Sequence, residues 1–216
     1  MAKNSIEELQ KKLVSATLTH VVFDGWNSVA LKRAAAELSW PRAEVDRLFP
    51  RGGLDAAIIF SKIADEEMLA GTSRELSSEM RIRDQVTRAV QCRLEFLEPH
   101  REAVRRLTSF MMLPGNGRHS FSLLYRTVDS IWFAVGDKSA DFSFYTKRAL
   151  LAGVVASTNV FWLEDQSEGH QDTWSFLDRR INDVLGIQKI RKKSEQIRGM
   201  MPNPLSCFFQ FKSVAS

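Results

Sequence analysis

Histidines and carboxylates are the residues that could carry chemistry in this chain. A metal centre inside a helical bundle needs carboxylates and Glu-x-x-His pairs, because residues three positions apart share a helix face. The chain has four histidines: His20, His100, His119 and His170. None of them stands three residues after a glutamate; Glu98 and Glu168 each precede a histidine by two positions, which places the paired side chains on divergent faces. The sequence therefore disfavours a di-iron or zinc enzyme, and we expect no metal.

Nucleophile and phosphate-binding motifs are also missing from the sequence. It contains no Gly-x-Ser-x-Gly elbow and no P-loop, and Gly115-Asn116-Gly117 is too short for a dinucleotide fingerprint. Two cysteines, Cys92 and Cys207, argue against a structural zinc site or a disulfide framework and favour a reducing compartment. We therefore expect no catalytic residues and no cofactor; the only group expected to be bound is a ligand. Without catalytic motifs, the sequence favours a binding protein.

The elements that would position a binding site are all predicted to be helices. Apolar residues make up 44% of the 216 residues and charged residues 26%, as in an ordinary globular protein. Ser5 and Glu8 form a capping box that starts a helix near Ile6, and Gly25 ends it. We find no alternating runs of strand length, and we expect a loop or a frayed turn at 71–79. Further helices are expected at 28–38, with Ser28 as its cap, and at 41–49, 54–69, 82–97, 101–113, 121–135, 142–163 and 174–185.

Residues 1–53 resemble the DNA-binding part of TetR-type repressors. Three short helices precede a longer one. The segment Phe23-Asp24-Gly25-Trp26 stands before the second helix, and Val45-Asp46-Arg47-Leu48-Phe49 stands where such repressors end their recognition helix. The resemblance implies an all-α, TetR-like fold: a helix-turn-helix-like module at 1–53, a helical ligand-binding and dimerisation bundle at 54–186, and an amphipathic tail at 187–216.

The same module departs from the repressors in its charges. Ser39 takes the place of the glycine usual between the second and third helices, and Asp46 replaces a tyrosine that contacts the DNA backbone in typical members. Glu44 adds a second negative charge where phosphate would lie. We therefore expect no nucleic-acid partner, although three arginines could still contact phosphate: Arg42, Arg47 and Arg51.

The stretch from Phe110 to Leu185 carries a more specific resemblance. It contains Gly136-Asp137-Lys138-Ser139-Ala140-Asp141-Phe142 and, further on, Asp172-Thr173-Trp174. Motifs of this kind in this order resemble the coenzyme Q (ubiquinone) biosynthesis accessory proteins called Coq-nine. That resemblance implies a non-enzymatic homodimer that binds isoprenoid quinone intermediates or phospholipid and presents quinone precursors to the di-iron demethoxyubiquinone hydroxylase. The alternative is a TetR-like transcriptional regulator with an apolar effector pocket.

A lipid pocket is expected where apolar residues exceed what one helix face can bury. Four consecutive apolar residues precede the turn at Pro114, and two of them are methionines, which adapt their shape to a flexible chain. The alternative is that these residues are ordinary core or a dimer interface. The candidate lipid-binding residues are Phe110, Met111, Met112, Leu113, Leu124, Val128, Leu151 and Val155.

A surface for the hydroxylase is expected where aromatic and charged residues gather between 130 and 148. Aromatic and arginine side chains dominate the energetics of protein interfaces, and the resemblance places the docking surface here. Trp132 could instead be core, and Asp141 could instead cap a helix. The candidate partner-binding residues are Ile131, Trp132, Asp141, Phe144, Tyr145 and Arg148.

The tail beyond residue 187 is basic and amphipathic. Such segments lie at the interface of anionic membranes, so we expect a membrane surface as a partner; the alternative is that the tail packs on its own chain or on a dimer mate. The sequence contains no run of about 18 apolar residues, so it predicts no membrane span. Residues 1–10 resemble neither a secretory signal nor a transit peptide. The expected location is the inner membrane periphery: the cytoplasmic side in a bacterium, the matrix side in a eukaryote. The candidate membrane-binding residues are Lys189, Ile190, Lys192, Lys193, Ile197 and Met201.

Overall fold

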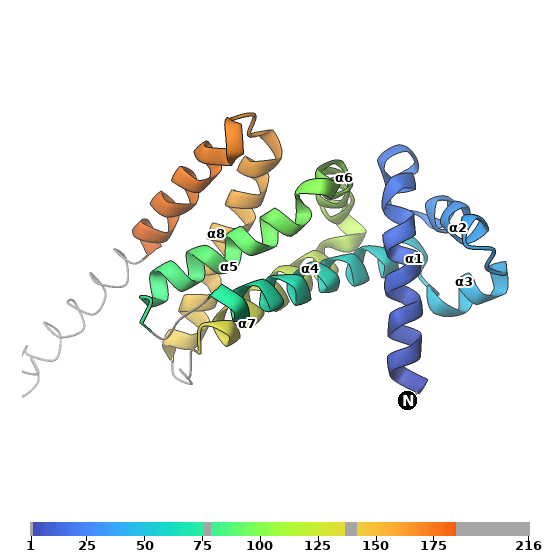
Figure 1. Ribbon diagram of the computed structural model, residues 1–216, viewed down its shortest axis with the longest axis horizontal. Coiled ribbons are helices and arrows are strands. Elements are labelled where there is room, and N and C mark those ends of the chain that lie inside the picture. The colour runs from blue at the N-terminus through green and yellow to red at the C-terminus, as the bar shows by residue number, and fades with distance from the viewer. Residues whose placement is uncertain (1, 76–78, 137–141, 185–216) are drawn as a thin grey trace, which may run out of the picture.

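A computed structural model describes residues 2–75, 79–136 and 142–184, with side chains from residue 6 onward except those of 142–144. This part of the chain contains helices and turns and no strand, which confirms the all-α prediction. Three helices form a unit at one end, and the long α4 leads from it into the body (Figure 1). The helices are α1 (Ala2–Asp24), α2 (Ser28–Glu37), α3 (Arg42–Leu48), α4 (Gly53–Glu75), α5 (Ile82–Leu97), α6 (Arg101–Met111), α7 (Gly117–Ala134), α8 (Phe142–Glu164) and a last one at 171–184.

The N-terminal unit is built on small residues that let helices approach closely. Ala30 and Ala34 of α2 are fully buried, and α2 packs against α1. The cap of α2 is Asn27 rather than the predicted Ser28: Oδ1 of Asn27 accepts hydrogen bonds from the backbone N–H groups of Val29 (2.8 Å) and Ala30 (3.2 Å). An asparagine side chain makes this cap as well as serine does, so the sequence offered two equivalent candidates one residue apart.

The turn between α2 and α3 holds Ser39 in the left-handed region, with φ 57°. Glycine adopts this conformation without steric cost, whereas a residue with a Cβ pays for it in strain. The next residue, Trp40, is partly buried against the core. The chain therefore retains the backbone geometry of a glycine turn without the glycine.

α4 extends further than the sequence suggested. The predicted loop at 71–79 is wrong over its first five residues, because the helix continues to Glu75. Thr72 is fully buried there and its hydroxyl donates to the backbone oxygen of Met68 (2.9 Å), so a polar residue is accommodated inside the helix. Gly71 faces the Cys92 side chain of α5, and a Cβ at this glycine would lie 3.2 Å from the sulfur.

The N-terminal unit and the body share one core. α1 packs against both α4 and α6. Trp26, which follows α1, is buried, donates from Nε1 to the backbone oxygen of Ala103 in α6 (3.0 Å), and lies with its ring centroid 5.4 Å from that of Phe60 in α4. These contacts fix the position of the N-terminal unit on the body.

Candidate functional site: an apolar pocket in the helical body

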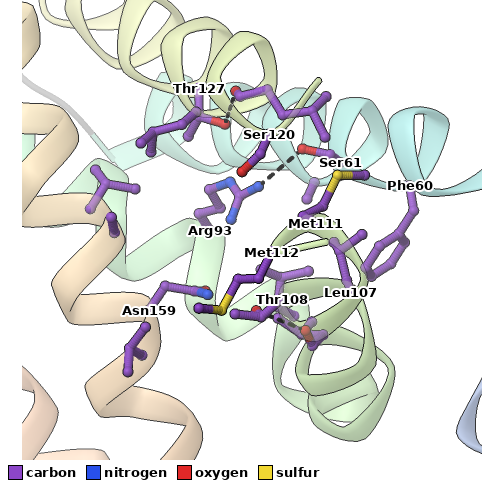
Figure 2. Close-up of a pocket in the computed structure, with 18 residues that line it drawn as sticks. Phe60, Ser61, Arg93, Leu107, Thr108, Met111, Met112, Ser120, Thr127 and Asn159 are labelled. Carbon is purple, nitrogen blue, oxygen red and sulfur yellow. Dashed lines mark hydrogen bonds between the residues drawn. The ribbon is translucent and has the colours of Figure 1, made fainter. Parts of the chain in front are cut away.

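A pocket of about 280 Å³ lies between α4, α5, α6, α7 and α8 (Figure 2). All five helices contribute side chains, so the site depends on the packing of the whole body. Its walls are mostly apolar, with a small number of hydroxyls, one amide and one guanidinium. The lining residues are Phe60, Ser61, Ala64, Arg93, Leu97, Val104, Leu107, Thr108, Met111, Met112, Ser120, Leu123, Leu124, Thr127, Val155, Ala156, Asn159 and Val160.

Half of the candidate lipid-binding residues line this pocket. Met111, Met112, Leu124 and Val155 do so, with Met111 buried and Met112 79% exposed at the rim. The other four do not line it. Val128 and Leu151 are buried in the core, Phe110 is partly buried against it, and Leu113 is half exposed.

The walls from α4 and α5 were not predicted as part of the site. Phe60 and Ala64 were hidden among ordinary core positions of a long helix, and nothing in the sequence separates them from the rest of the core. Arg93 did leave a signal: it stands one helical turn before the buried Leu97 and one turn after the buried Ala89, on the inward face of α5.

A buried carboxylate lies behind the pocket. Asp65 of α4 is 3% exposed, and its Oδ1 accepts from Nε of Arg93 (3.0 Å) and from Oγ1 of Thr127 (2.8 Å). Its Oδ2 accepts from Nε of Arg126 (3.1 Å). The cluster joins α4, α5 and α7, and two of its members, Arg93 and Thr127, also line the pocket.

The candidate partner-binding residues do not form one exposed surface. Ile131 is fully buried in the core, and Trp132 is 9% exposed, with the ammonium of Lys147 5.5 Å from its ring centroid. Arg148 is 7% exposed and makes an ion pair with Asp129 of α7 (2.7 Å). Ile131 and Arg148 are therefore corrected to structural positions, because little of either side chain is left for a partner.

Among the remaining partner candidates only Tyr145 has a described and exposed side chain, at 69%. Asp141 and the side chain of Phe144 lie outside the described residues. Phe133 of α7, which was not a candidate, is 80% exposed.

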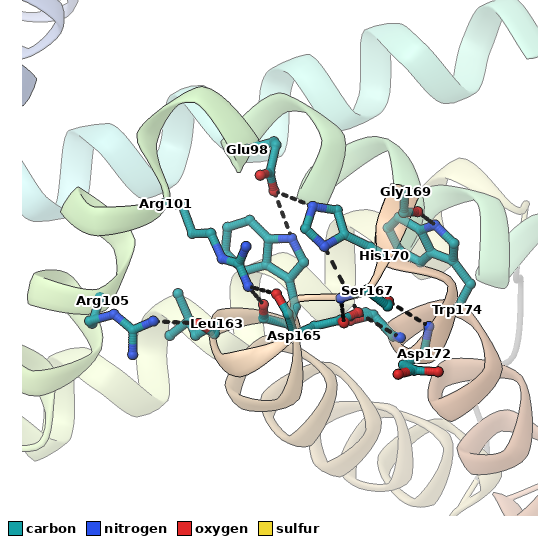
Figure 3. Close-up of polar contacts among 12 residues, drawn as sticks. Glu98, Arg101, Arg105, Leu163, Asp165, Ser167, Gly169, His170, Asp172 and Trp174 are labelled. Carbon is teal, nitrogen blue, oxygen red and sulfur yellow. Dashed lines mark hydrogen bonds and ion pairs between the residues drawn. The ribbon is translucent and has the colours of Figure 1, made fainter.

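The Asp-Thr-Trp motif closes the turn between α8 and the last helix (Figure 3). Asp165 accepts hydrogen bonds from the backbone N–H of Ser167 (2.8 Å) and from the N–H (2.9 Å) and hydroxyl (2.5 Å) of Thr173. Burial alone would raise the pKa of Asp165, but the hydrogen bonds from Thr173 and Ser167 outweigh it and hold that pKa well below its usual range. Trp174 donates from Nε1 to the backbone oxygen of Gly169 (2.8 Å). Thr173 and Trp174 of the motif thus have structural roles in this turn.

The same turn is fastened to the end of α5. Glu98 accepts a hydrogen bond from Nε1 of the buried Trp162 (3.0 Å), and Nε2 of His170 lies 2.9 Å from the same oxygen. Arg101 donates to the backbone oxygens of Trp162 and Asp165. These contacts hold α8 against α6, and so hold the α8 wall of the pocket in place.

Comparisons with known proteins agree with this architecture. Residues 117–188 match the family model described as COQ9. The chain is 32% identical over 200 residues to the ubiquinone biosynthesis protein COQ9-B, mitochondrial, of Xenopus laevis. The alignment covers 88% of this chain and 67% of that protein. The chain belongs to the COQ9 family. It is also 32% identical over 200 residues to the human ubiquinone biosynthesis protein COQ9, mitochondrial, but spans only 61% of that protein's length.

The fold of this COQ9-family chain is that of TetR regulators, as predicted. A TetR transcriptional regulator from Nitrosomonas europaea aligns with 82% of this chain and 98% of its own, with a TM-score of 0.66 and 19% sequence identity. At that identity the likeness concerns the fold alone.

The N-terminal unit of this COQ9-family chain carries arginines that are paired within the chain. Arg47 of α3 makes an ion pair with Glu44 (2.6 Å), and Arg51 makes one with Asp55 (2.6 Å). Asp46 is exposed on the same seven-residue helix. Each pair places a carboxylate beside an arginine that the sequence offered as a phosphate contact, whereas Arg42, the third such arginine, is exposed on α3.

Two further expectations concern metals and membranes. No group of three or more potential metal ligands occurs in the part of the chain that the structure describes. None of the helices described is long and apolar enough to cross a membrane. The candidate membrane-binding residues of the tail lie outside the described residues.

Proposed function

We propose that this COQ9-family chain is a non-enzymatic accessory protein of ubiquinone biosynthesis. It binds isoprenoid quinone precursors in the pocket of the helical body and presents them to the demethoxyubiquinone hydroxylase. The pathway is suggested by the names of its relatives, which are ubiquinone biosynthesis proteins. The binding role is supported above all by the apolar pocket enclosed by five helices.

The size of the pocket bears on how a lipid is held. A volume of about 280 Å³ is at the lower end of the range for small-molecule sites, so it encloses only part of a polyisoprenoid. The rim, however, carries Met112 (79% exposed) and Val160 (55% exposed). Burial of these apolar side chains under a lipid chain would remove them from water, so the tail leaves the pocket along them.

Lipid extraction and mass spectrometry of the purified protein test this proposal. The wild type is expected to carry prenylated or acyl lipids. Met112→Asp at the rim and Val155→Asp in the wall place a charge where the chain would lie, so both should lose the lipid. Val29→Asp, the same change at a half-exposed position of α2, is the matched control and should retain it. Lipid-free wild type, or full lipid content in a folded Met112→Asp variant, would contradict the proposal.

Docking of the hydroxylase is the second part of the proposal. Tyr145 of α8 and Phe133 of α7 are exposed aromatic residues in the region where the family resemblance places the docking surface, and Phe144 stays a candidate. Tyr145→Ala is expected to weaken binding to the hydroxylase of the same organism by about 1–3 kcal/mol, the range of interface hot spots. Tyr125→Ala on α7, which is 39% exposed, is the control in the same titration. Unchanged affinity for Tyr145→Ala would exclude this residue from the interface.

The proposed location is the periphery of the inner membrane, with the basic tail as the contact. The two COQ9 relatives compared above are named mitochondrial, which supports a mitochondrial location for a eukaryotic source; the matrix side is part of the proposal. A chain cut after Leu185 should fold but no longer sediment with anionic vesicles. Equal sedimentation of the cut and full chains would place the membrane contact elsewhere. We further propose a homodimer, which sedimentation equilibrium of the wild type tests.

A further inference from the structure

Arg93 is the only charged residue among the described side chains that line the pocket. Its side chain is 13% exposed, so it has little contact with bulk water. Figure 2 shows its guanidinium pointing into the pocket, with Ser61 and Ser120 near it. A guanidinium stays protonated in a protein, so this pocket always contains a positive charge.

The arginine is held in place from behind. Asp65 accepts a hydrogen bond from Nε of Arg93 at 3.0 Å, which leaves the two terminal nitrogens on the pocket side. One of them, Nη2, reaches Oγ of Ser61 at 3.5 Å, the outer limit of a hydrogen bond. The carboxylate therefore orients the guanidinium fork and does not occupy it.

The charges of this cluster do not balance. Asp65 contributes one negative charge and is shared by two arginines, Arg93 and Arg126. Nη2 of Arg126 is buried and has no hydrogen-bond partner among the described residues. The side chain of Arg126 is 35% exposed and is partly hydrated, whereas that of Arg93 is only 13% exposed. Arg93 therefore has little water and only a shared carboxylate to compensate its charge, and an incompletely compensated buried charge is costly. A ligand that brings one negative charge or a strong hydrogen-bond acceptor would offset that cost.

We propose that Arg93 is the head-group contact of the pocket and that it selects amphipathic ligands whose head carries a planar oxyanion, a carboxylate or a phenolate. This inference rests on the proposed lipid-binding function and adds the chemistry of the head group to it. The guanidinium fork matches two oxygens of such a group, which a point charge does not. Ser120 supplies a hydroxyl to the same end of the pocket, while the exposed rim at Met112 takes the tail.

The second polar group of the pocket fits this orientation. Asn159 of α8 lines the pocket, and its buried Oδ1 has no hydrogen-bond partner among the described residues. Figure 2 shows its amide on the side of Met112, away from Ser61. It would contact a ligand beyond the head group, so the oxyanion contact is assigned to Arg93 alone.

A matched pair of probes tests the proposal: laurate and methyl laurate, which share a chain and differ in the charge of the head. Each displaces Nile red from delipidated, full-length protein. The wild type is expected to bind laurate at least about tenfold more tightly than methyl laurate, the effect of one charge-assisted contact. Arg93→Gln should lose that preference while its affinity for methyl laurate stays the same. Arg106→Gln, on the exposed side of α6 where Arg106 pairs with Glu102, is the control and should keep it.

Equal affinity of the wild type for the two probes, or an undiminished preference in Arg93→Gln, would overturn the proposal. If Arg93→Gln fails to fold, Arg93→Lys keeps the charge but loses the fork, so it should weaken laurate binding alone; equal losses for both probes would also overturn it. Failure of the wild type to bind Nile red or either probe would instead contradict the proposed lipid-binding function.

Discussion

The N-terminal unit and the pocket both carry arginines, but their carboxylates balance them differently. In the N-terminal unit Arg47 and Arg51 each have their own carboxylate within four residues, at the surface. In the body Arg93 and Arg126 share the single carboxylate of Asp65 in the interior. The local ion pairs compensate the arginines where a TetR regulator would bind phosphate. The shared carboxylate leaves part of the positive charge of Arg93 uncompensated inside the pocket. The fold is shared with TetR regulators, so the proposed difference in function rests on the charge pattern and not on the architecture.

Removal of the shared carboxylate should have the largest effect. Asp65→Ala leaves the largely buried Arg93 without its carboxylate, so we expect the free energy of unfolding to fall by about 3–5 kcal/mol. Glu44→Ala removes the partner of Arg47 at the surface, where water screens the pair, and should change the free energy of unfolding far less. Urea unfolding of both variants measures the contrast. Similar losses in the two would mean that the two kinds of pairing are equivalent in energy.

Asp165 provides a second test in the body, with a pH signature. Asp165→Asn weakens hydrogen bonds from Ser167 and Thr173 to a charged acceptor, and should lower the free energy of unfolding by about 2 kcal/mol at pH 7. Because the pKa of Asp165 is lowered in the folded state, its contribution is present above about pH 4 and is lost as the pH falls further. Thermal melts from pH 7 to pH 3 should show the gap between wild type and variant closing. A gap that is constant with pH would argue that Asp165 is not ionised in the fold.

A smaller effect of opposite sign is expected in the N-terminal unit. Ser39 has φ 57°, so Ser39→Gly relieves strain and should stabilise the chain by up to about 1 kcal/mol. Ser109→Gly, at an exposed position inside α6, should destabilise it by roughly 0.5 kcal/mol because glycine lowers helix propensity there. The two melting temperatures should therefore move in opposite directions; a decrease for Ser39→Gly would contradict the argument from strain.

The smallest effect concerns duplex DNA. Glu44→Gln frees Arg47 for phosphate, so the slope of log K against log salt should steepen by about 0.9. Overall binding should stay in the nonspecific range, with Kd above about 1 μM at physiological salt. Fluorescence anisotropy with a random duplex measures both. Sequence-selective nanomolar binding by the wild type would restore the regulator as a candidate.

The helices were predictable because their signals are local. The period of apolar residues and the breaks at Glu98-Pro99 placed α5 at the bounds that the structure has. The end of α4 was missed because the polar stretch after residue 70 looks like a loop, while Thr72 turns inward and satisfies its hydroxyl on the helix backbone. Whether a polar residue faces in or out depends on the neighbouring helix, which the sequence does not reveal.

The pocket was predictable only in part, for the same reason. The methionines before Pro114 were found because four apolar residues in a row exceed one helix face. Arg148 was assigned to a surface because it is one helical turn from residue 144, but its own guanidinium is buried against Asp129. Spacing identifies residues that point in one direction; it does not say what lies there. For Arg93 the sequence did show a charge on an apolar helix face. It did not show that the partner of this arginine is Asp65, 28 positions away.

The contact between Trp26 and Phe60 has a spectroscopic consequence. Phe60 lines the pocket, and the indole of Trp26 lies against it on the side of the N-terminal unit, with 3% of its surface exposed. An indole in such a dry environment emits at short wavelength and responds to small changes in its neighbours. A ligand that displaces the Phe60 ring alters the surroundings of Trp26 in one step. The chain has five tryptophans, so in a variant that keeps Trp26 alone the natural fluorescence would report a ligand in the pocket without any label.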